Sequence, residues 1–143
     1  MKMKSFTASD SIFIDTSWFK GLLDPRDDFY LQANAQLDTL QTKGYFSITT
    51  NYIIDETLTL LRQKSGLELA LKFRSMLVGM RTNLKIIRIT AQDEFKAWEW
   101  FPKNWSKLSF TDCTSFAVMQ RLDLKDVATF DDHFSRAGFN MLS

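Results

Sequence analysis

Two aspartates, Asp15 and Asp131, each follow a short apolar run, and both could bind a cation. Residues 11–14 read Ser-Ile-Phe-Ile, and residues 127–130 read Val-Ala-Thr-Phe. Such short runs are typical of parallel strands that are covered on both faces. Because the carboxyl ends of parallel strands share one edge of a sheet, we expect the two carboxylates to lie where open α/β sheets bind ligands. Turn formation after a strand explains either acid alone equally well, so the prediction depends on their combination.

Two further acids are expected on helices that reach the same edge. Asp112 stands three residues after Ser109, which is the spacing of a helix start, and it shares a helical face with Phe116. Glu56 lies on the apolar arc of a helix predicted over 52–64. A capping box alone would account for Asp112, and a surface ion pair for Glu56. A carboxylate beside a core is costly without a cation or hydrogen-bond donors, so four converging acids predict a partner.

Four crowded carboxylates favour a hard divalent cation. They raise one another's pKa unless a cation neutralises them, and oxygen ligands favour Mg²⁺ or Mn²⁺. Such a metal activates water and stabilises a phosphate; whether one or two ions bind is left open by the sequence. Neighbouring hydroxyl groups are candidates for orienting the carboxylates or a water. These supporting groups are Thr16, Ser17, Thr111 and Ser115.

The composition predicts one compact domain without a disulfide. The chain has 143 residues, 45% of them hydrophobic, which is enough for a single core; we expect a flexible lead-in over 1–10 and one domain over 11–143. The net charge of +1 gives no general sign of a nucleic-acid or membrane partner. One Cys and one His are too few for a disulfide or a zinc site built on those ligands. No apolar run is long enough for a signal peptide or a spanning helix, so a cytoplasmic protein without a membrane partner is expected.

The order of the predicted elements indicates the α/β class. Strands alternate with helices, which favours a mainly parallel sheet covered by helices. The predicted strands cover residues 11–14, 45–49, 84–89, 127–130 and 139–142. The predicted helices cover residues 24–43, 52–64, 67–81 and 91–101, and a last one starts at 109. In the helix at 24–43, Asp24 is expected as the N-cap, with Pro25 at the first helical position.

Four stretches of the sequence together resemble one family. They are Ile12-Phe-Ile-Asp-Thr-Ser17, Asn51-Tyr-Ile-Ile-Asp-Glu-Thr57, Ser109-Phe-Thr-Asp-Cys-Thr-Ser-Phe116 and Ala128-Thr-Phe-Asp-Asp-His-Phe134. In this order they resemble the PIN-domain ribonucleases, and most closely the VapC-type toxins of prokaryotic toxin–antitoxin pairs. The resemblance implies a three-layer α/β/α sandwich and Mg²⁺- or Mn²⁺-dependent endonucleolytic cleavage of RNA. It also implies a cognate antitoxin and a homodimer.

Carried onto this chain, the resemblance makes Asp15, Glu56, Asp112 and Asp131 the acidic set, with Asp15 and Asp112 as direct metal ligands. The departures from the family pattern are the longer lead-in and the tryptophan-rich segment 98–105.

Other interpretations of these residues stay open. A receiver-like phosphoacceptor module also gathers acids at a sheet edge, but such a module requires adjacent acids after the first strand and a lysine after the last strand. A PIN-like domain that binds RNA or a partner without cutting is disfavoured by the four intact acids.

The aromatic residues of 98–105 could stack on bases, although packing is favoured. The apolar residues of 67–80 cover more than one helical face, which suits either an intramolecular neighbour or a partner surface. Cys113 with His133 as a nucleophile pair is rejected, because nothing in the sequence orients the histidine.

Overall fold

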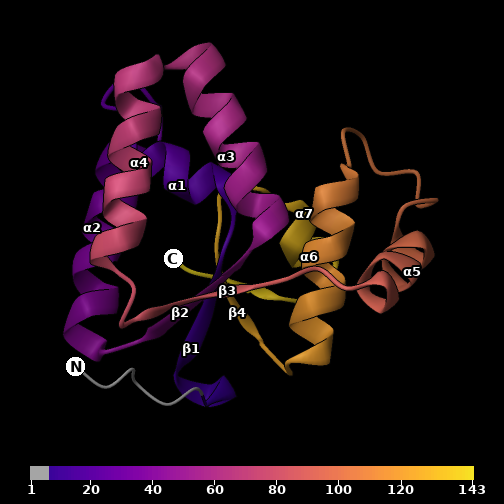
Figure 1. Ribbon diagram of the computed structural model, residues 1–143. Coiled ribbons are helices and arrows are strands. Elements are labelled where there is room, and N and C mark those ends of the chain that lie inside the picture. The colour runs from indigo at the N-terminus through magenta and orange to yellow at the C-terminus, as the bar shows by residue number, and fades with distance from the viewer. Residues whose placement is uncertain (1–6) are drawn as a thin grey trace.

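The computed structural model describes residues 7–143, and its centre is a five-stranded sheet in which every strand runs parallel to its neighbours (Figure 1). The order across the sheet is β3-β2-β1-β4-β5. The strands are β1 (Ser11–Ile14), β2 (Phe46–Thr50), β3 (Leu84–Ile87), β4 (Asp126–Ala128) and β5 (Asn140–Met141). The predicted strands are thus all present, but the one expected at 127–130 ends at Ala128, before Phe130.

Helices cover both faces of this sheet. They are α1 (Thr16–Leu23), α2 (Tyr30–Lys43), α3 (Asn51–Lys64), α4 (Leu67–Gly79), α5 (Ala91–Trp100), α6 (Phe110–Arg121) and α7 (His133–Arg136). Helices α1 to α4 pack against one another on one side, and α5, α6 and α7 form a separate group on the other (Figure 1). The predicted three-layer α/β/α sandwich with a mainly parallel sheet is therefore confirmed.

The strand order reverses beside the central strand, and we call the region at the carboxyl ends of β1 and β4 the crevice. The chain passes from β1 to β2 and β3 on one side, and then returns to place β4 and β5 on the other side of β1. The register pairs Ile14 with Ala128 at the carboxyl ends of β1 and β4. A reversal of strand order between two parallel strands leaves an opening outside their carboxyl ends, and ligands bind there. Asp15 and Asp131 follow these two strands, so both lie at this topological switch point.

Helix α6 is positioned by its own cap and by neighbouring α5. Ser109 and Asp112 form the predicted capping box, in which each side chain bonds the backbone N–H of the other. Arg121, the last residue of α6, donates two hydrogen bonds of 2.8 and 2.9 Å to the buried carboxylate of Asp93 on α5. The cap thus defines where α6 begins, and the ion pair holds its last residue against α5.

The predicted helix at 24–43 was wrong in its first part. Asp24 ends α1 instead of starting a helix, and α2 begins only at Tyr30. The Asp24 carboxylate accepts hydrogen bonds from the Ser65 hydroxyl at 2.6 Å and from the Arg26 amide at 3.0 Å, so it stabilises a turn. Helix α1, which the sequence analysis did not predict, occupies the eight residues directly after Asp15. It supplies core side chains such as Trp18.

The predicted lead-in over 1–10 is described only in part. Residues 1–6 lie outside the described residues, and Ala8–Asp10 form one 3₁₀ turn before β1. From residue 7 onward, the buried apolar side chains form one hydrophobic core. In that part of the chain, no helix is both long and apolar enough to span a membrane.

We expect Phe116→Ala to destabilise the fold strongly, because Phe116 anchors α6 in the core. Its ring is fully buried and lies 5.2 Å from the Trp100 ring and 5.0 Å from the Phe134 ring, between centroids. Removing a buried phenylalanine costs about 3–5 kcal/mol of unfolding free energy. Urea denaturation measures the loss. The control Phe95→Ala, at a side chain that is 66% exposed, should change stability by less than about 0.5 kcal/mol. Equal losses in the two variants would contradict this role of Phe116.

Candidate active site

Asp15 is held by two hydroxyl groups at the carboxyl end of β1. The residue is buried, at 3% exposure, and it precedes α1 as the N-cap. Its Oδ2 accepts hydrogen bonds from the Ser17 hydroxyl at 2.9 Å and from the Thr129 hydroxyl at 2.8 Å. The same hydroxyls accept the backbone N–H groups of Phe130 and Asp131, each at 3.0 Å. These bonds join the start of α1 to the loop after β4, and both hydroxyls bond the same carboxylate oxygen, Oδ2.

Asp112 caps its helix and faces the same crevice. Its Oδ2 accepts the Ser109 backbone N–H at 3.2 Å, while the side chain as a whole is nearly buried. The same Oδ2 lies 3.5 Å from Nδ1 of His133. Asp112 therefore caps α6, as the capping-box interpretation expects, and the same carboxylate also lies beside His133 in the site.

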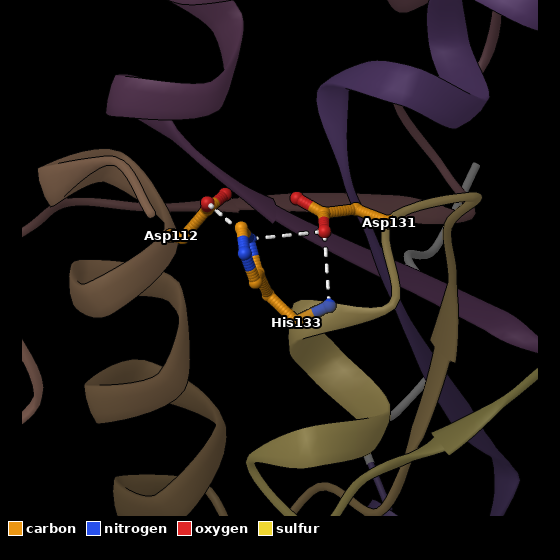
Figure 2. Close-up of side chains that lie close together, drawn as sticks. All are labelled: Asp112, Asp131 and His133. Carbon is orange, nitrogen blue, oxygen red and sulfur yellow. Dashed lines mark hydrogen bonds and ion pairs between the residues drawn. The ribbon is translucent and has the colours of Figure 1, made fainter. Parts of the chain in front are cut away.

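Asp131 and His133 complete a close group with Asp112 (Figure 2). Asp131 Oδ1 accepts the backbone N–H of His133 at 2.9 Å, and it lies 3.1 Å from His133 Nδ1. One ligand atom from each of the three residues lies within 4.8 Å of the other two. Figure 2 shows the imidazole ring between the two carboxylates, with Asp112 coming from α6 and the other two residues from the loop and helix that follow β4.

Glu56 lies on α3, and its charge affects the pKa of two of the other acids. It is partly buried, whereas its neighbour Asp55 is exposed. The charge of Glu56 contributes to raising the pKa of both Asp15 and Asp112. The four predicted acids therefore belong to one electrostatic group, although Asp15 and Glu56 lie outside the closest trio.

The raised pKa values of Asp15 and Asp112 show that grouping these acids has a free-energy cost. Burial, followed by the nearby charge of Asp112, raises the pKa of Asp15 to about 7 against the hydrogen bonds from Thr129 and Ser17. Burial, followed by the charge of Asp131, raises the pKa of Asp112 to about 6. Among residues 7–143, His133 is the only basic side chain within 4 Å of any of the four acids. Negative charge in the crevice thus lacks a lysine or arginine to balance it.

Of the four predicted supporting hydroxyl residues, Ser17 bonds an acid, Thr16 and Ser115 bond other groups, and Thr111 is placed by its backbone carbonyl, which accepts from Ser115. Ser17 contacts Asp15, as described above. Thr16 is buried and accepts a hydrogen bond of 3.3 Å from Thr57 on α3. Ser115 donates at 3.0 Å to the backbone carbonyl of Thr111, so its hydroxyl bonds its own helix instead of an acid.

Two site residues were missed by the sequence analysis, Thr129 and His133. The Thr-x-Asp spacing of 129–131 carried a signal, because a threonine hydroxyl commonly bonds the backbone N–H two residues on. His133 was considered only as a partner of Cys113. Burial and the charge of Asp112 raise the pKa of the Cys113 thiol to about 11, which agrees with rejecting a thiolate nucleophile.

The tryptophan-rich segment packs beside the site. Trp100 and Trp105 are partly buried, and the Trp100 ring lies against Phe116. The Trp105 ring lies nearly parallel to the His133 ring, at an interplanar angle of 16° and with centroids 6.1 Å apart. Trp98 is 58% exposed. The segment thus forms one wall of the crevice while leaving Trp98 at the surface.

The donor set fits a divalent cation. Asp112 and Asp131 offer carboxylate oxygens from two elements, and the raised pKa values of Asp15 and Asp112 reflect charges that a cation would neutralise. His133 Nδ1 is buried and has no hydrogen-bond partner among the described residues, so a potential ligand atom also points into the group.

Residues 12–140 match the family model of the PIN domain, and the chain belongs to this family. It is similar to the 23S rRNA-specific endonuclease VapC20 of Mycobacterium tuberculosis, with 33% identity over 129 residues, which cover 90% of this chain and 95% of VapC20; two strains give the same values. The crystal structure of VapC20, described as a sarcin–ricin loop cleaving toxin, superposes with a TM-score of 0.79 over 90% of this chain and 95% of the other, at 31% identity. FitAcB from Neisseria gonorrhoeae shares the fold, with a TM-score of 0.64 at 16% identity over 92% of this chain and 96% of that one. The resemblance inferred from the four motifs is confirmed.

We expect Asp15→Asn to stabilise the metal-free protein at pH 8. The pKa of Asp15 is raised from 3.8 to about 7 on folding, so between these pH values the folded state binds more protons than the unfolded state, and stability falls as the pH rises. Asparagine keeps an oxygen that can accept from Ser17 and Thr129 but removes the buried charge. The gain at pH 8 should be on the order of 1–3 kcal/mol, and the decline in stability from pH 4 to 7 should become shallower.

Urea denaturation with a chelator, at pH 5 and at pH 8, measures both effects. Asp123→Asn is the control, because Asp123 is exposed and its φ of 57° suits asparagine. A loss of stability at pH 8 in Asp15→Asn, with the slope unchanged, would show that burial of the Asp15 charge is not the dominant cost.

Proposed function

We propose that this chain is a divalent-metal-dependent endoribonuclease of the VapC type, and that its substrate is the sarcin–ricin loop of 23S rRNA. The observation that carries the proposal is the gathering of four acids at the switch point between β1 and β4, with the pKa of two of them raised by crowding and burial. The substrate is taken from VapC20, to which this chain is similar over nearly its whole length.

The proposed cofactor is Mg²⁺ or Mn²⁺. A bound ion of this kind supplies an activated water and stabilises charge on the phosphate. Asp112 and Asp131 would hold it directly, and Asp15 would contribute the carboxylate oxygen that Ser17 and Thr129 leave available. Glu56 would add negative charge from α3 and would accept a proton or orient a water. The hydroxyls of Ser17 and Thr129 keep the Asp15 carboxylate in one orientation, which is the function of outer hydrogen bonds at metal sites.

Cations beside the crevice suit an RNA backbone. Lys103 Nζ lies 5.6 Å from the Trp100 ring centroid and 5.9 Å from that of Trp105. The Arg136 guanidinium lies 4.9 Å from the Trp105 ring centroid. Because the Trp105 ring neighbours His133, these positive charges lie on the Trp105 side of the site and could meet phosphates of a strand that enters it. They supply a local positive field although the net charge of the chain is only +1.

The proposed protein partners are a cognate antitoxin and a second copy of this chain, acting in the cytoplasm. Apolar side chains on α4 remain exposed, with Leu67 at 49%, Leu71 at 53% and Val78 at 54%. A pocket of about 360 Å³ lies next to this helix, between α2, α4 and the sheet, and its lining includes Leu37, Leu40 and Met76. Several large apolar side chains exposed on one helix favour a partner surface there. The helix predicted over 67–81 therefore keeps apolar surface that its own domain does not cover.

We expect light scattering after gel filtration to give twice the chain mass of 16.7 kDa for the purified, antitoxin-free protein. The physical reason is the exposed apolar surface, which a second copy would bury. The measurement is made over a concentration series from about 1 to 100 μM, the range in which transient dimers dissociate. A mass of one chain at every concentration would contradict the homodimer.

We expect the purified protein with Mn²⁺ or Mg²⁺ to produce a discrete new end in the sarcin–ricin loop of isolated ribosomal RNA. Asp112→Asn should lower the cleavage rate by at least about 10²-fold, because it removes a charge from the metal group while keeping the helix cap. End mapping by sequencing detects the cut, with a chelator and the exposed-site variant Asp123→Asn as controls.

Each outcome of this experiment bears on a separate part of the proposal. Metal-dependent cuts elsewhere in the RNA would retain the nuclease and reject the sarcin–ricin loop as its substrate. Absence of any cut by folded, partner-free protein would reject catalysis in favour of a PIN-like domain that only binds RNA.

A further inference from the structure

His133 is fixed in the crevice by a hydrogen bond of one ring nitrogen and by packing of the ring against Trp105. Its Nε2 lies 2.8 Å from the backbone carbonyl oxygen of Ser106, in the segment before α6. Its Nδ1 lies 3.1 Å from Asp131 Oδ1 and 3.5 Å from Asp112 Oδ2. The Trp105 ring runs nearly parallel to the imidazole, and the side chain is only 13% exposed. The ring therefore has little freedom to turn away from the two carboxylates (Figure 2).

The contact with Ser106 determines the tautomer of the neutral ring. A carbonyl oxygen has no hydrogen to donate, so Nε2 must carry the proton of this hydrogen bond. In the neutral imidazole the other nitrogen, Nδ1, then presents a lone pair. This lone pair is the group that faces Asp112 and Asp131.

Nothing in the described part of the chain satisfies that lone pair. Nδ1 is buried and has no hydrogen-bond partner, because the 3.1 Å approach to Asp131 does not have the geometry of a hydrogen bond. With the ring neutral, three electron-pair donors, one nitrogen and two carboxylate oxygens, thus lie within 4.8 Å of one another and repel one another. Such an arrangement is the usual surrounding of a bound cation. A histidine that ligates a metal also commonly donates its other N–H to a backbone carbonyl, as Nε2 does here.

We propose that His133 Nδ1 is a direct ligand of the metal ion, together with Asp112 and Asp131. This inference rests on the proposed metal-dependent function and adds a nitrogen donor to a site that the sequence described with carboxylates alone. A nitrogen donor favours a first-row transition ion such as Mn²⁺ over Mg²⁺, which takes oxygen ligands in a strict octahedral geometry. The site is therefore selective for Mn²⁺, and His133 is the source of that selectivity.

Electron spin echo envelope modulation of the Mn²⁺-loaded protein tests the ligand directly. A coordinated imidazole nitrogen gives a ¹⁴N modulation, and His133 is the only histidine of the chain, so untagged protein leaves no other source of an imidazole signal. We expect the modulation in the wild-type protein and its loss in His133→Phe, which keeps an aromatic ring against Trp105. Calorimetry should show that the ratio of Mn²⁺ to Mg²⁺ affinity falls about tenfold in His133→Phe.

A second variant keeps the inference testable if His133→Phe misfolds. His133→Gln supplies an amide oxygen, and it should bind Mn²⁺ without the imidazole modulation and with a reduced preference over Mg²⁺. Bound Mn²⁺ in the wild-type protein without ¹⁴N modulation would overturn the inference, even if the protein cleaves RNA. Imidazole modulation in a protein that cuts no RNA would support His133 as a ligand while rejecting the nuclease function. Failure of Mn²⁺ to bind would overturn the inference, and failure of both Mn²⁺ and Mg²⁺ to bind would overturn the proposed function as well.

Discussion

Repulsion among buried carboxylates at the carboxyl ends of β1 and β4 is the constraint on which the site depends. Burial and mutual charge raise the pKa of Asp15 to about 7 and that of Asp112 to about 6, so a metal-free protein at neutral pH carries a free-energy cost there. Ion binding to the folded state offsets such a cost and adds stability in proportion to the logarithm of the ion concentration. In the proposed metal-dependent enzyme, function and stability would therefore be linked through the bound cation.

The fold holds these acids together because each comes from a separately fixed element. Asp15 ends the central strand, and the hydroxyls of Ser17 and Thr129 tie it to the loop after β4. Asp112 is fixed by its capping box at the start of α6. Since the strand order reverses between β1 and β4, the crevice opens where these elements meet. A local change in any one of them would move one ligand relative to the others.

Short-range patterns made much of this arrangement predictable. The apolar run before Asp15 and the Ser109 capping spacing gave the strand and the helix start, because both depend on neighbouring residues. The helix expected from Asp24 failed because its carboxylate bonds Ser65, which is 41 positions away. His133 escaped notice for a similar reason, since the carbonyl of Ser106 that orients its ring lies 27 positions upstream. Long-range contacts of single side chains carry no periodic signal in the sequence.

Anomalous diffraction from crystals grown with Mn²⁺ tests most directly whether a divalent cation balances the crowded acids. We expect one strong anomalous peak in contact with the carboxylates of Asp112 and Asp131, at the switch point between β1 and β4. The peak should vanish in crystals of Asp112→Asn that are grown with the same ion. Well-ordered acids without a peak at saturating Mn²⁺, or a peak bound only to surface carboxylates, would contradict a metal centre at this edge of the sheet.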